Sequence, residues 1–232
     1  MVTESTNHNQ IGTLQESSLH ATLKAHYQMQ GDQLETLVDG YVVDIVRPDL
    51  LIEIQTANFT AIRSKLRKLV KNHRLKLVYP IAQDKWIVRL ETDDTIVSRR
   101  KSPKTGRPED LFYELVRMPN LIAHPNFTLE VVLTQQEEFW INDGKGSWRR
   151  KRWSIGDRKL LEVIDTIEYT TPTDFLAAIP ADLERPFTNR QLTKALHLRR
   201  GHAAKITYCL RKMGLLEITG KQGNAHLFAE TN

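Results

Sequence analysis

Hydrophobic periodicity over the first third of the chain predicts alternating helices and strands. Two segments place their apolar residues at helical spacing, and four shorter segments are rich in β-branched and apolar residues, as strands are. The predicted helices cover residues 13–27 and 56–71, and the predicted strands cover 33–38, 41–46, 51–55 and 75–81. The predicted order over roughly residues 13–82 is therefore helix, strand, strand, strand, helix, strand.

Two apolar strands among these, 41–46 and 51–55, each carry one acidic residue, although an unpaired charge is costly to bury. If residues 48–49 form a two-residue turn, Arg47 pairs with Leu50 and Asp44 lies directly opposite Glu53. Two carboxylates this close repel unless one is protonated or a cation lies between them. Hard divalent cations are bound by one or two carboxylates together with water and substrate phosphate, so the pair predicts half of a Mg²⁺ site.

The acidic pair resembles the signature of the PD-(D/E)XK nuclease superfamily, in which an Asp is followed on the next strand by Glu-x-Lys. Here the matching residues are Asp44 and Glu53-Ile54-Gln55, with Gln in the usual place of Lys, as in some restriction endonucleases of that superfamily. The resemblance implies an α/β fold with a restriction-endonuclease-like mixed sheet flanked by helices. It also implies that Asp44 and Glu53 hold Mg²⁺, with Mn²⁺ as a substitute, and that Gln55 orients the attacking water. Lys65 could supply the positive charge that Gln55 lacks.

The resemblance further implies an acidic residue on the first helix, facing the metal site. Glu16 lies in the matching element, and His20 lies one turn further along the same face. Thr13 and Glu16 also have capping-box spacing, so a helix cap is an equal alternative for Glu16. Glu35, beside a turn, is a second acidic candidate.

Two basic segments follow this region. A predicted hairpin at 86–98 leads into 99–108, which holds five cationic side chains and no acid, and 145–153 combines cations with two tryptophans. Pro and Gly predict that the first segment is a loop suited to phosphate contact or a minor-groove arm, although an ordinary exposed loop is the alternative. In the second, Arg and Trp can clamp a backbone and stack on a base, or the tryptophans can pack under the sheet edge. The candidate DNA contacts are Arg99, Arg100, Lys101, Lys104, Arg107, Arg149, Arg150, Lys151 and Arg152.

The rest of the first domain shows weaker patterns. A helix is predicted over 109–118 and a strand over 127–133, whereas 159–169 fits either a strand or a helix. The stretch 170–172 predicts a boundary, which divides the chain into a nuclease-like domain at 1–171 and a second domain at 172–232.

The second domain is predicted to contain three short helices followed by a hairpin. The helices cover 173–179, 189–196 and 202–213, and the hairpin strands cover 215–219 and 225–229. This order, together with the sequence at 208–216, resembles a winged helix-turn-helix. From residue 185 onward there are nine Lys or Arg against two Glu. The resemblance implies a recognition helix near 201–213 in a major groove, although many such domains bind proteins instead. The implied phosphate contacts are Arg199, Arg200, Lys205 and Lys221.

Composition narrows the function classes without choosing among them. The 232 residues carry a net charge of +5, with 26% charged and 40% hydrophobic residues, as expected for a globular protein. Cys209 is the only cysteine, so an intramolecular disulfide and a cysteine-based zinc site are excluded. No apolar run approaches a membrane span and no leader pattern begins the chain, so a cytoplasmic protein with no membrane partner is expected.

The sequence therefore predicts a Mg²⁺-dependent DNA endonuclease, targeted to double-stranded or branched DNA by its C-terminal domain. One alternative is a catalytically inactive, nuclease-like DNA-binding protein or regulator. Another is an RNA-directed nuclease. A homodimer is left open, since cutting both strands would normally require two active sites.

Overall fold

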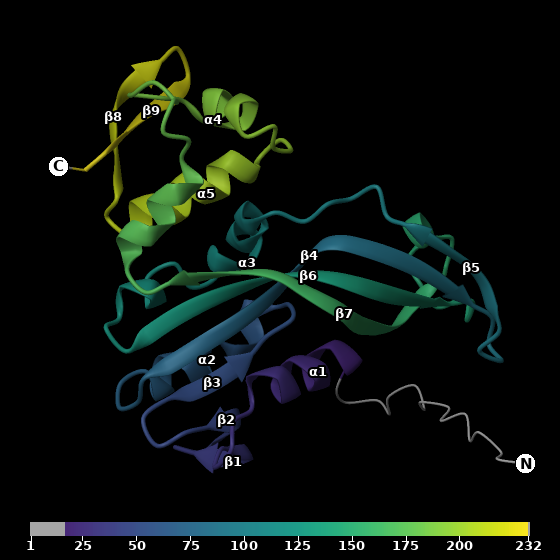
Figure 1. The fold of residues 1–232 in the computed structure, drawn as a ribbon. Coiled ribbons are helices and arrows are strands. Elements are labelled where there is room, and N and C mark those ends of the chain that lie inside the picture. Colours follow the sequence, from purple (N-terminus) through teal and green to yellow (C-terminus); the bar gives the residue numbers. More distant parts are fainter. Residues whose placement is uncertain (1–16, 232) are drawn as a thin grey trace, which may run out of the picture.

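Within residues 17–231, which the computed structural model describes, a mixed sheet of seven strands forms the centre of the fold (Figure 1). Its order is β1-β2-β3-β4-β6-β7, with β5 pairing to a free stretch of β4. The strands are β1 (Gln33–Val38), β2 (Tyr41–Val46), β3 (Leu51–Ile54), β4 (Leu75–Leu90), β5 (Ile96–Lys101), β6 (Phe127–Ile141) and β7 (Ser154–Tyr169). Glu16 lies outside the described residues.

Helices cover both faces of this sheet. The helices are α1 (Ser18–Tyr27), α2 (Phe59–Leu69), α3 (Phe112–Leu115), α4 (Asn189–Ala195) and α5 (His202–Lys212). Four 3₁₀ turns are described with them: η1 (Pro108–Leu111), η2 (Leu121–Ala123), η3 (Trp148–Arg150) and η4 (Pro172–Ala178). None of these helices, all within residues 17–231, is long and apolar enough to span a membrane.

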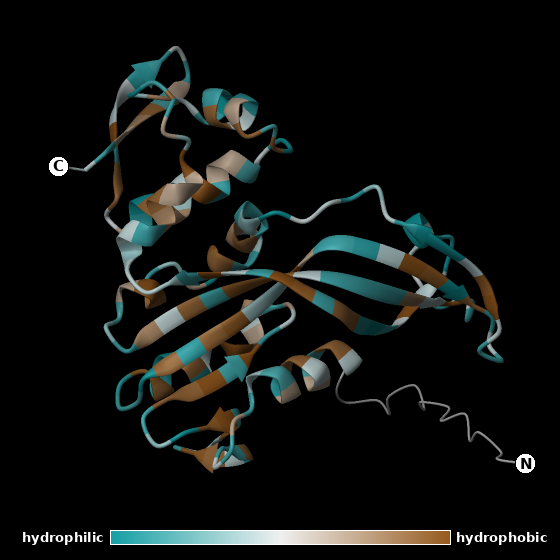
Figure 2. Ribbon diagram, viewed as in Figure 1, coloured by the Kyte–Doolittle hydropathy of each residue, from teal (hydrophilic) through white to brown (hydrophobic). Residues whose placement is uncertain are grey.

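Alternation along the strands separates two cores. Leu51 packs with α2 and α3 on one face, whereas Ile52 and Ile54 pack with Leu19 and Leu23 of α1 on the other. The predicted α/β class, with a mixed sheet flanked by helices, is therefore confirmed. Hydrophobic and hydrophilic residues alternate in bands along the long strands (Figure 2), because successive side chains point to opposite faces.

The predicted turn and register of the central hairpin are confirmed. The Arg47 N–H donates to the Leu50 carbonyl at 2.9 Å, which closes the two-residue turn. Ile45 then pairs with Ile52, so the next position along the hairpin places Asp44 opposite Glu53. From β3 the chain crosses through α2 to β4, which runs parallel to β3 and to β6.

The second half of the sheet differs from the prediction. β4 is one continuous strand rather than two, and β6 and β7 extend beside it, so the three form a long twisted arm. β5 pairs with the end of β4, Trp86 opposite Lys101, so Arg99, Arg100 and Lys101 belong to a strand and not to the predicted loop. Pairing over this length depends on partners distant in sequence, which local periodicity does not reveal.

Two helices are shorter than predicted. α1 begins at Ser18, with the Ser17 hydroxyl accepting from the His20 N–H at 3.4 Å, so the helix starts after the predicted cap at Thr13. The predicted helix over 109–118 is instead η1 followed by the single turn α3. Arg107 and Asp110 form a capping box there, and Pro108 follows as the first helical residue.

The C-terminal residues form a helical module that ends in a two-stranded hairpin, β8 (Leu216–Gln222) and β9 (Ala225–Glu230). Phe187 forms an isolated antiparallel bridge with Phe228, so a short extended segment before α4 lies against the hairpin. The predicted N-cap Thr188 is confirmed, and it accepts from the Gln191 N–H at 3.3 Å. We call residues 172–231 the tail module.

The tail module shares one apolar core with the α2 and α3 face of the sheet. Phe175 in η4 stacks on Tyr169 with ring centroids 4.3 Å apart, and its edge meets Phe112 of α3. The His202 ring of α5 bonds to the Glu109 carbonyl at 2.7 Å. The module is therefore packed against the sheet body.

Candidate active site

The predicted acidic pair lies where β2 and β3 separate. The backbone ladder between these strands ends at Ile45 and Ile52. One residue further, the Asp44 carboxylate replaces a strand partner, and its Oδ2 accepts the Ile54 N–H at 2.7 Å. Asp44 is therefore fixed beside the residue that follows Glu53. The structure thus brings together the two carboxylates that the sequence predicted to be neighbours.

Glu53 is buried with incomplete hydrogen bonding. Its residue is only 5% exposed, and one carboxylate oxygen, Oε1, accepts a bond from the Lys65 ammonium of α2. The other oxygen, Oε2, is buried without a hydrogen-bond partner in the described part of the chain. Such orphaned acceptors are rare in folded proteins, because they lose hydration without replacement.

Lys65 reaches Glu53 because of its position on α2. Phe59, Leu66 and Leu69 bury one side of the helix, and Lys65 lies at the edge of that buried stripe. Only 14% of its side chain is exposed. The aliphatic stem is covered while the ammonium meets the carboxylate.

The two carboxylates have opposite pKa shifts. Burial would raise the pKa of Asp44, but the bonds from His20 and the Ile54 N–H, with the positive charge of Lys65, hold it below its usual value. Burial and the neighbouring Asp44 charge raise the pKa of Glu53 to about 7, against the opposing effect of Lys65. Near neutral pH, therefore, Asp44 is ionised and Glu53 exchanges its proton.

The other acidic candidates occupy different positions. His20 Nε2 lies 3.2 Å from Asp44 Oδ2, so α1 does contribute a side chain to the site. Glu35 lies on the far side of β2, is mostly exposed and pairs with Lys24 at 2.6 Å. Among the described residues, α1 therefore meets the pair through His20.

Gln55 is turned away from the acidic pair. Its backbone N–H donates to the Val78 carbonyl at 2.9 Å, and its side-chain amide donates to the Ala57 carbonyl. Lys65, rather than Gln55, is the polar side chain bonded to Glu53. The sequence signal for Lys65 was its place on the helix directly after the Glu-x-Gln strand.

The donor set fits a hard divalent cation. Glu53 Oε2, which is buried and has no partner within residues 17–231, and the neighbouring Asp44 carboxylate are oxygen ligands of the kind that Mg²⁺ and Mn²⁺ take. Residues 17–231 contain no group of three or more His, Cys, Asp or Glu arranged to hold a metal ion. A Mg²⁺ site with two carboxylates does not need such a group, since water and substrate phosphate supply the remaining ligands.

Comparison with known proteins gives the family. Residues 17–170 match the family described as Domain of unknown function (DUF8091). The chain belongs to this DUF8091 family. A protein of Treponema pallidum (strain Nichols), described as an uncharacterized protein, is 30% identical over 222 residues, which cover 94% of this chain and 86% of that protein. No solved structure matches the chain.

The matched DUF8091 region contains both predicted basic segments, and the structure separates their cations into two groups. On β5, Arg99 pairs with Glu137 at 2.6 Å and Lys101 pairs with Asp84 at 2.9 Å, so acids distant in sequence partly neutralise them. Arg100 is exposed. By contrast, Lys104 is exposed in the loop 102–107 and has no acidic partner among the described residues.

The second basic segment lies at the tip of the arm, between β6 and β7. Trp153 is half-buried, with the Arg89 guanidinium 5.3 Å from its ring, whereas Trp148 is 79% exposed. Trp153 is therefore packed, as one alternative predicts, whereas Trp148 is exposed, as stacking on a base would require. The predicted contacts around them are largely exposed: Arg149, Lys151 and Arg152 fully, and Arg150 in part.

The predicted contacts of the tail module, which follows the DUF8091 match, face two directions. Arg200 and Lys221 are exposed. The Lys205 ammonium instead lies 5.6 Å from the ring centre of Tyr113 in α3, and Arg199 lines a pocket between the tail module and the sheet body. Packing of α5 on α3 causes this difference, and no local sequence pattern predicts that packing.

Proposed function

We propose that this DUF8091 protein is a Mg²⁺-dependent DNA endonuclease of the PD-(D/E)XK type, with Asp44 and Glu53 as its metal ligands. The order of α1, three strands, α2 and β4 supports a restriction-endonuclease-like core. The single observation that carries the proposal is the buried Glu53 carboxylate, which has one free oxygen and lies beside an ionised Asp44. A bound divalent ion would polarise the scissile phosphate and lower the pKa of an attacking water.

The residues of the chain have distinct roles in this proposal. Asp44 stays ionised and holds its position through the Ile54 N–H and His20. Glu53 supplies its free oxygen once it loses its proton. Lys65 places a positive charge beside the same site, where it stabilises charge that develops on the phosphate and occupies the role usually given to the signature Lys. Gln55 is left with a structural role at the start of the β3–α2 connection.

The tail module supports DNA as the target. Its order of helix, extended segment, two helices and hairpin resembles that of a winged helix domain, and the nine Lys or Arg against two Glu from residue 185 onward favour a polyanion. Tyr208 and Arg211 lie one turn apart on the exposed side of α5, which would enter a major groove.

A second candidate is a catalytically inactive DNA-binding regulator. The engagement of the Gln55 amide with Ala57, away from the acidic pair, favours it. In that case the Lys65 ammonium would serve only to neutralise Glu53.

Cleavage of plasmid, linear and branched DNA with Mg²⁺ or Mn²⁺ tests the proposal. We expect Asp44→Asn and Glu53→Gln each to reduce cleavage about a thousandfold, because the lost metal stabilisation is worth several kcal/mol. The matched control is Glu35→Gln, a carboxylate on the next strand that already pairs with Lys24. Equal cleavage by the parent protein and by the Asp44 and Glu53 variants would refute the mechanism, and DNA binding without cleavage would select the regulator.

A further inference from the structure

Two adjoining pockets form a groove that lies partly between the tail module and the sheet body and continues along the sheet body. One has a volume of about 610 Å³ and the other about 360 Å³. Both are lined by Lys104, Asp110 and Tyr113, so one pocket opens into the other. We call this the edge groove.

The edge groove begins beside the candidate active site. β4 pairs with β3 as far as Val78 and with β5 from Trp86 onward, so the stretch between them is an open sheet edge. Residues 79–82 of this edge line the groove, and so do Thr56 and Ala57, which directly follow the Glu-x-Gln strand. A nucleic-acid strand leaving the acidic pair therefore meets no β-strand of the described residues along this edge as far as Ala82, where the loop 102–107 bonds to β4.

The loop 102–107 forms the roof at the middle of this route. The Gly106 N–H donates to the Ala82 carbonyl at 3.0 Å, which holds the loop against the open edge of β4. A Cβ at Gly106 would lie 2.4 Å from the Ala82 oxygen, so only glycine permits this close approach. The loop thereby brings Lys104 and Arg107 to the groove wall.

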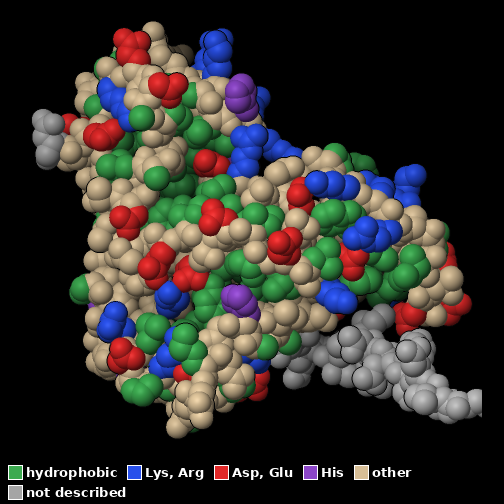
Figure 3. All heavy atoms as spheres, in the orientation of Figure 1, with side chains coloured by type: hydrophobic (Ala, Val, Ile, Leu, Met, Phe, Trp, Pro, Cys, Tyr) green, Lys and Arg blue, Asp and Glu red, His purple; other side chains and the backbone are tan. Residues whose placement is uncertain are grey.

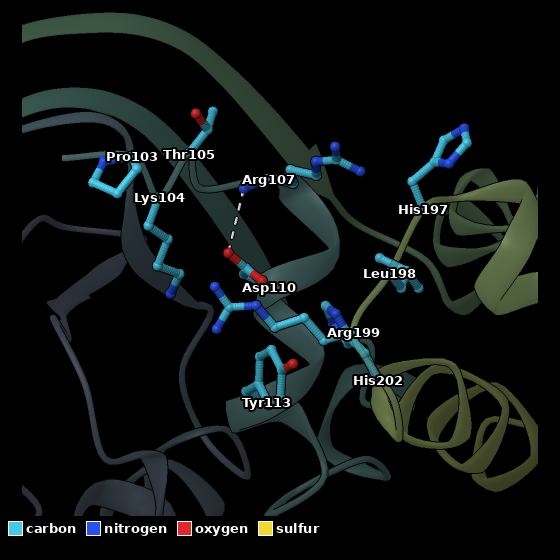
Figure 4. A pocket seen from close by; sticks show the side chains of 10 residues that line it. All are labelled: Pro103, Lys104, Thr105, Arg107, Asp110, Tyr113, His197, Leu198, Arg199 and His202. Atoms are coloured by element: carbon cyan, nitrogen blue, oxygen red, sulfur yellow. Dashed lines mark hydrogen bonds between the residues drawn. The ribbon is translucent and has the colours of Figure 1, made fainter. Parts of the chain in front are cut away.

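Positive charge without acidic partners gathers on both walls. Lys104 comes from the sheet body and Arg199 from the tail module, and their side chains extend into the groove from opposite walls (Figure 4). Within residues 17–231 neither pairs with a carboxylate, and the Arg107 guanidinium donates to the Leu196 carbonyl at 2.8 Å. Lys and Arg side chains follow this junction on the face shown in Figure 3. Across both pockets the lining holds five Lys or Arg, of which Lys85 and Arg158 pair with Glu138, and one further acid, Asp110.

An aromatic ring lies among these cations. Tyr113 is 37% exposed and lines both pockets, with the His202 ring 4.2 Å away on one side. Cations that follow a backbone, combined with a ring on which a base can stack, are the means by which proteins hold single-stranded nucleic acid. A single strand can place an unpaired base on such a ring, whereas the bases of a duplex are already stacked on one another.

We propose that the edge groove binds a single DNA strand, so that the substrate is a duplex carrying a single-stranded arm. The proposal rests on the proposed nuclease function and specifies its substrate class. The tail module holds the duplex, and the arm passes between Lys104 and Arg199, across Tyr113 and along the open edge of β4. The junction of duplex and arm is thereby presented to Asp44 and Glu53.

Binding measured in EDTA tests the groove independently of catalysis. The probes are a fluorescent blunt duplex and the same duplex with an oligothymidine arm, and the readout is the ratio of their dissociation constants. We expect the parent protein to favour the armed duplex by about tenfold, and Lys104→Glu/Arg199→Glu to bring the ratio close to one. Tyr113→Ala, which removes no charge, should lower the ratio about fivefold through lost stacking.

The matched control is Arg67→Glu/Lys71→Glu, which reverses the charge of two exposed cations outside the groove, one in the last turn of α2 and one just after it. This control should weaken binding to both probes and leave the ratio unchanged, and melting temperatures should show that every variant is folded. An unchanged ratio in both groove variants, or a parent protein that binds the two probes equally, would overturn the proposal. If arm preference depends on the groove but no DNA is cut, the groove stands and the nuclease function fails. Cleavage that depends on Asp44 without any arm preference gives the reverse result.

Discussion

Two buried glutamates on the same sheet, Glu53 and Glu138, differ in how completely they are satisfied. They are 5% and 4% exposed, respectively. Glu138 on β6 accepts bonds from Lys85 at 3.0 Å, Arg158 at 3.2 Å and the Trp140 ring N–H at 2.8 Å. Glu53 on β3 has Lys65 on one oxygen, and in the described part of the chain nothing bonds to the other.

The pKa values follow this difference. Burial would raise both, but the Trp140 bond and the charges of Lys85 and Arg158 hold the pKa of Glu138 below its usual value. For Glu53, burial and the charge of Asp44 prevail over Lys65 and raise the pKa to about 7. The two glutamates are equally buried but differ in their partners: Glu138 forms a structural ion pair, whereas Glu53 has capacity for a further ligand. Three predictions test this contrast.

The largest expected effect is on DNA cleavage, and it should come from Lys65, which pairs with a buried glutamate. Lys65→Met should reduce DNA cleavage about a hundredfold, because it removes the positive charge beside the proposed reaction centre. The matched control is Lys76→Met, since Lys76 also pairs with a buried glutamate, Glu130, at 2.6 Å. That control should lower thermal stability while leaving the cleavage rate of the folded protein unchanged. If both lysine variants lose cleavage equally, Lys65 has no special role.

The next effect concerns stability. Glu138→Gln should lower the free energy of unfolding by about 2 kcal/mol at neutral pH, since it leaves Lys85 and Arg158, which are partly exposed, without their shared carboxylate. At the same pH Glu53→Gln should not lower it, because burial and the Asp44 charge disfavour the ionised carboxylate that the amide replaces. Urea denaturation of the two variants measures both values. A larger loss for Glu53→Gln than for Glu138→Gln would contradict the contrast.

The sequence predicted the part of the site that depends on local pairing. Counting back from a two-residue turn placed Asp44 opposite Glu53, because a strand period of two and a fixed turn leave one register. The helix after β3 was also predicted, and with it the position of Lys65. Individual side-chain hydrogen bonds were not predictable, because nothing in the sequence shows that the Gln55 amide donates to the Ala57 carbonyl.

What depends on distant partners was not predictable. The pairing of Arg99 with Glu137 joins residues 38 positions apart, and it follows from the full length of β4 and β6. Likewise, the edge groove exists because α5 packs on α3 and the loop 102–107 crosses β4, and neither contact has a periodic signal. The sequence predicted all the basic residues of 99–107 alike as DNA contacts, and only the fold shows which of them pair with a carboxylate.

The smallest effect, measured over one pH unit, is a pH dependence of stability that should distinguish the two glutamates. In the unfolded chain Glu53 loses its proton near 4.5, whereas in the folded protein it keeps the proton to about 7. Between these values the unfolded state binds fewer protons, so the contribution of Glu53 is full below pH 4.5 and is lost as pH rises toward 7, by about 1 kcal/mol per pH unit. The difference in free energy of unfolding between the parent protein and Glu53→Gln should therefore change steadily between pH 5 and 7.

Glu138 should behave differently, because its folded pKa is lowered. Its contribution to stability is present above its unfolded pKa and is lost only as pH falls through the folded value. The difference in free energy of unfolding between the parent protein and Glu138→Gln should therefore be constant over the same range. Urea denaturation at several pH values without divalent ions measures both curves, and a level curve for Glu53→Gln would show that this carboxylate is already satisfied and has no capacity for a metal ion.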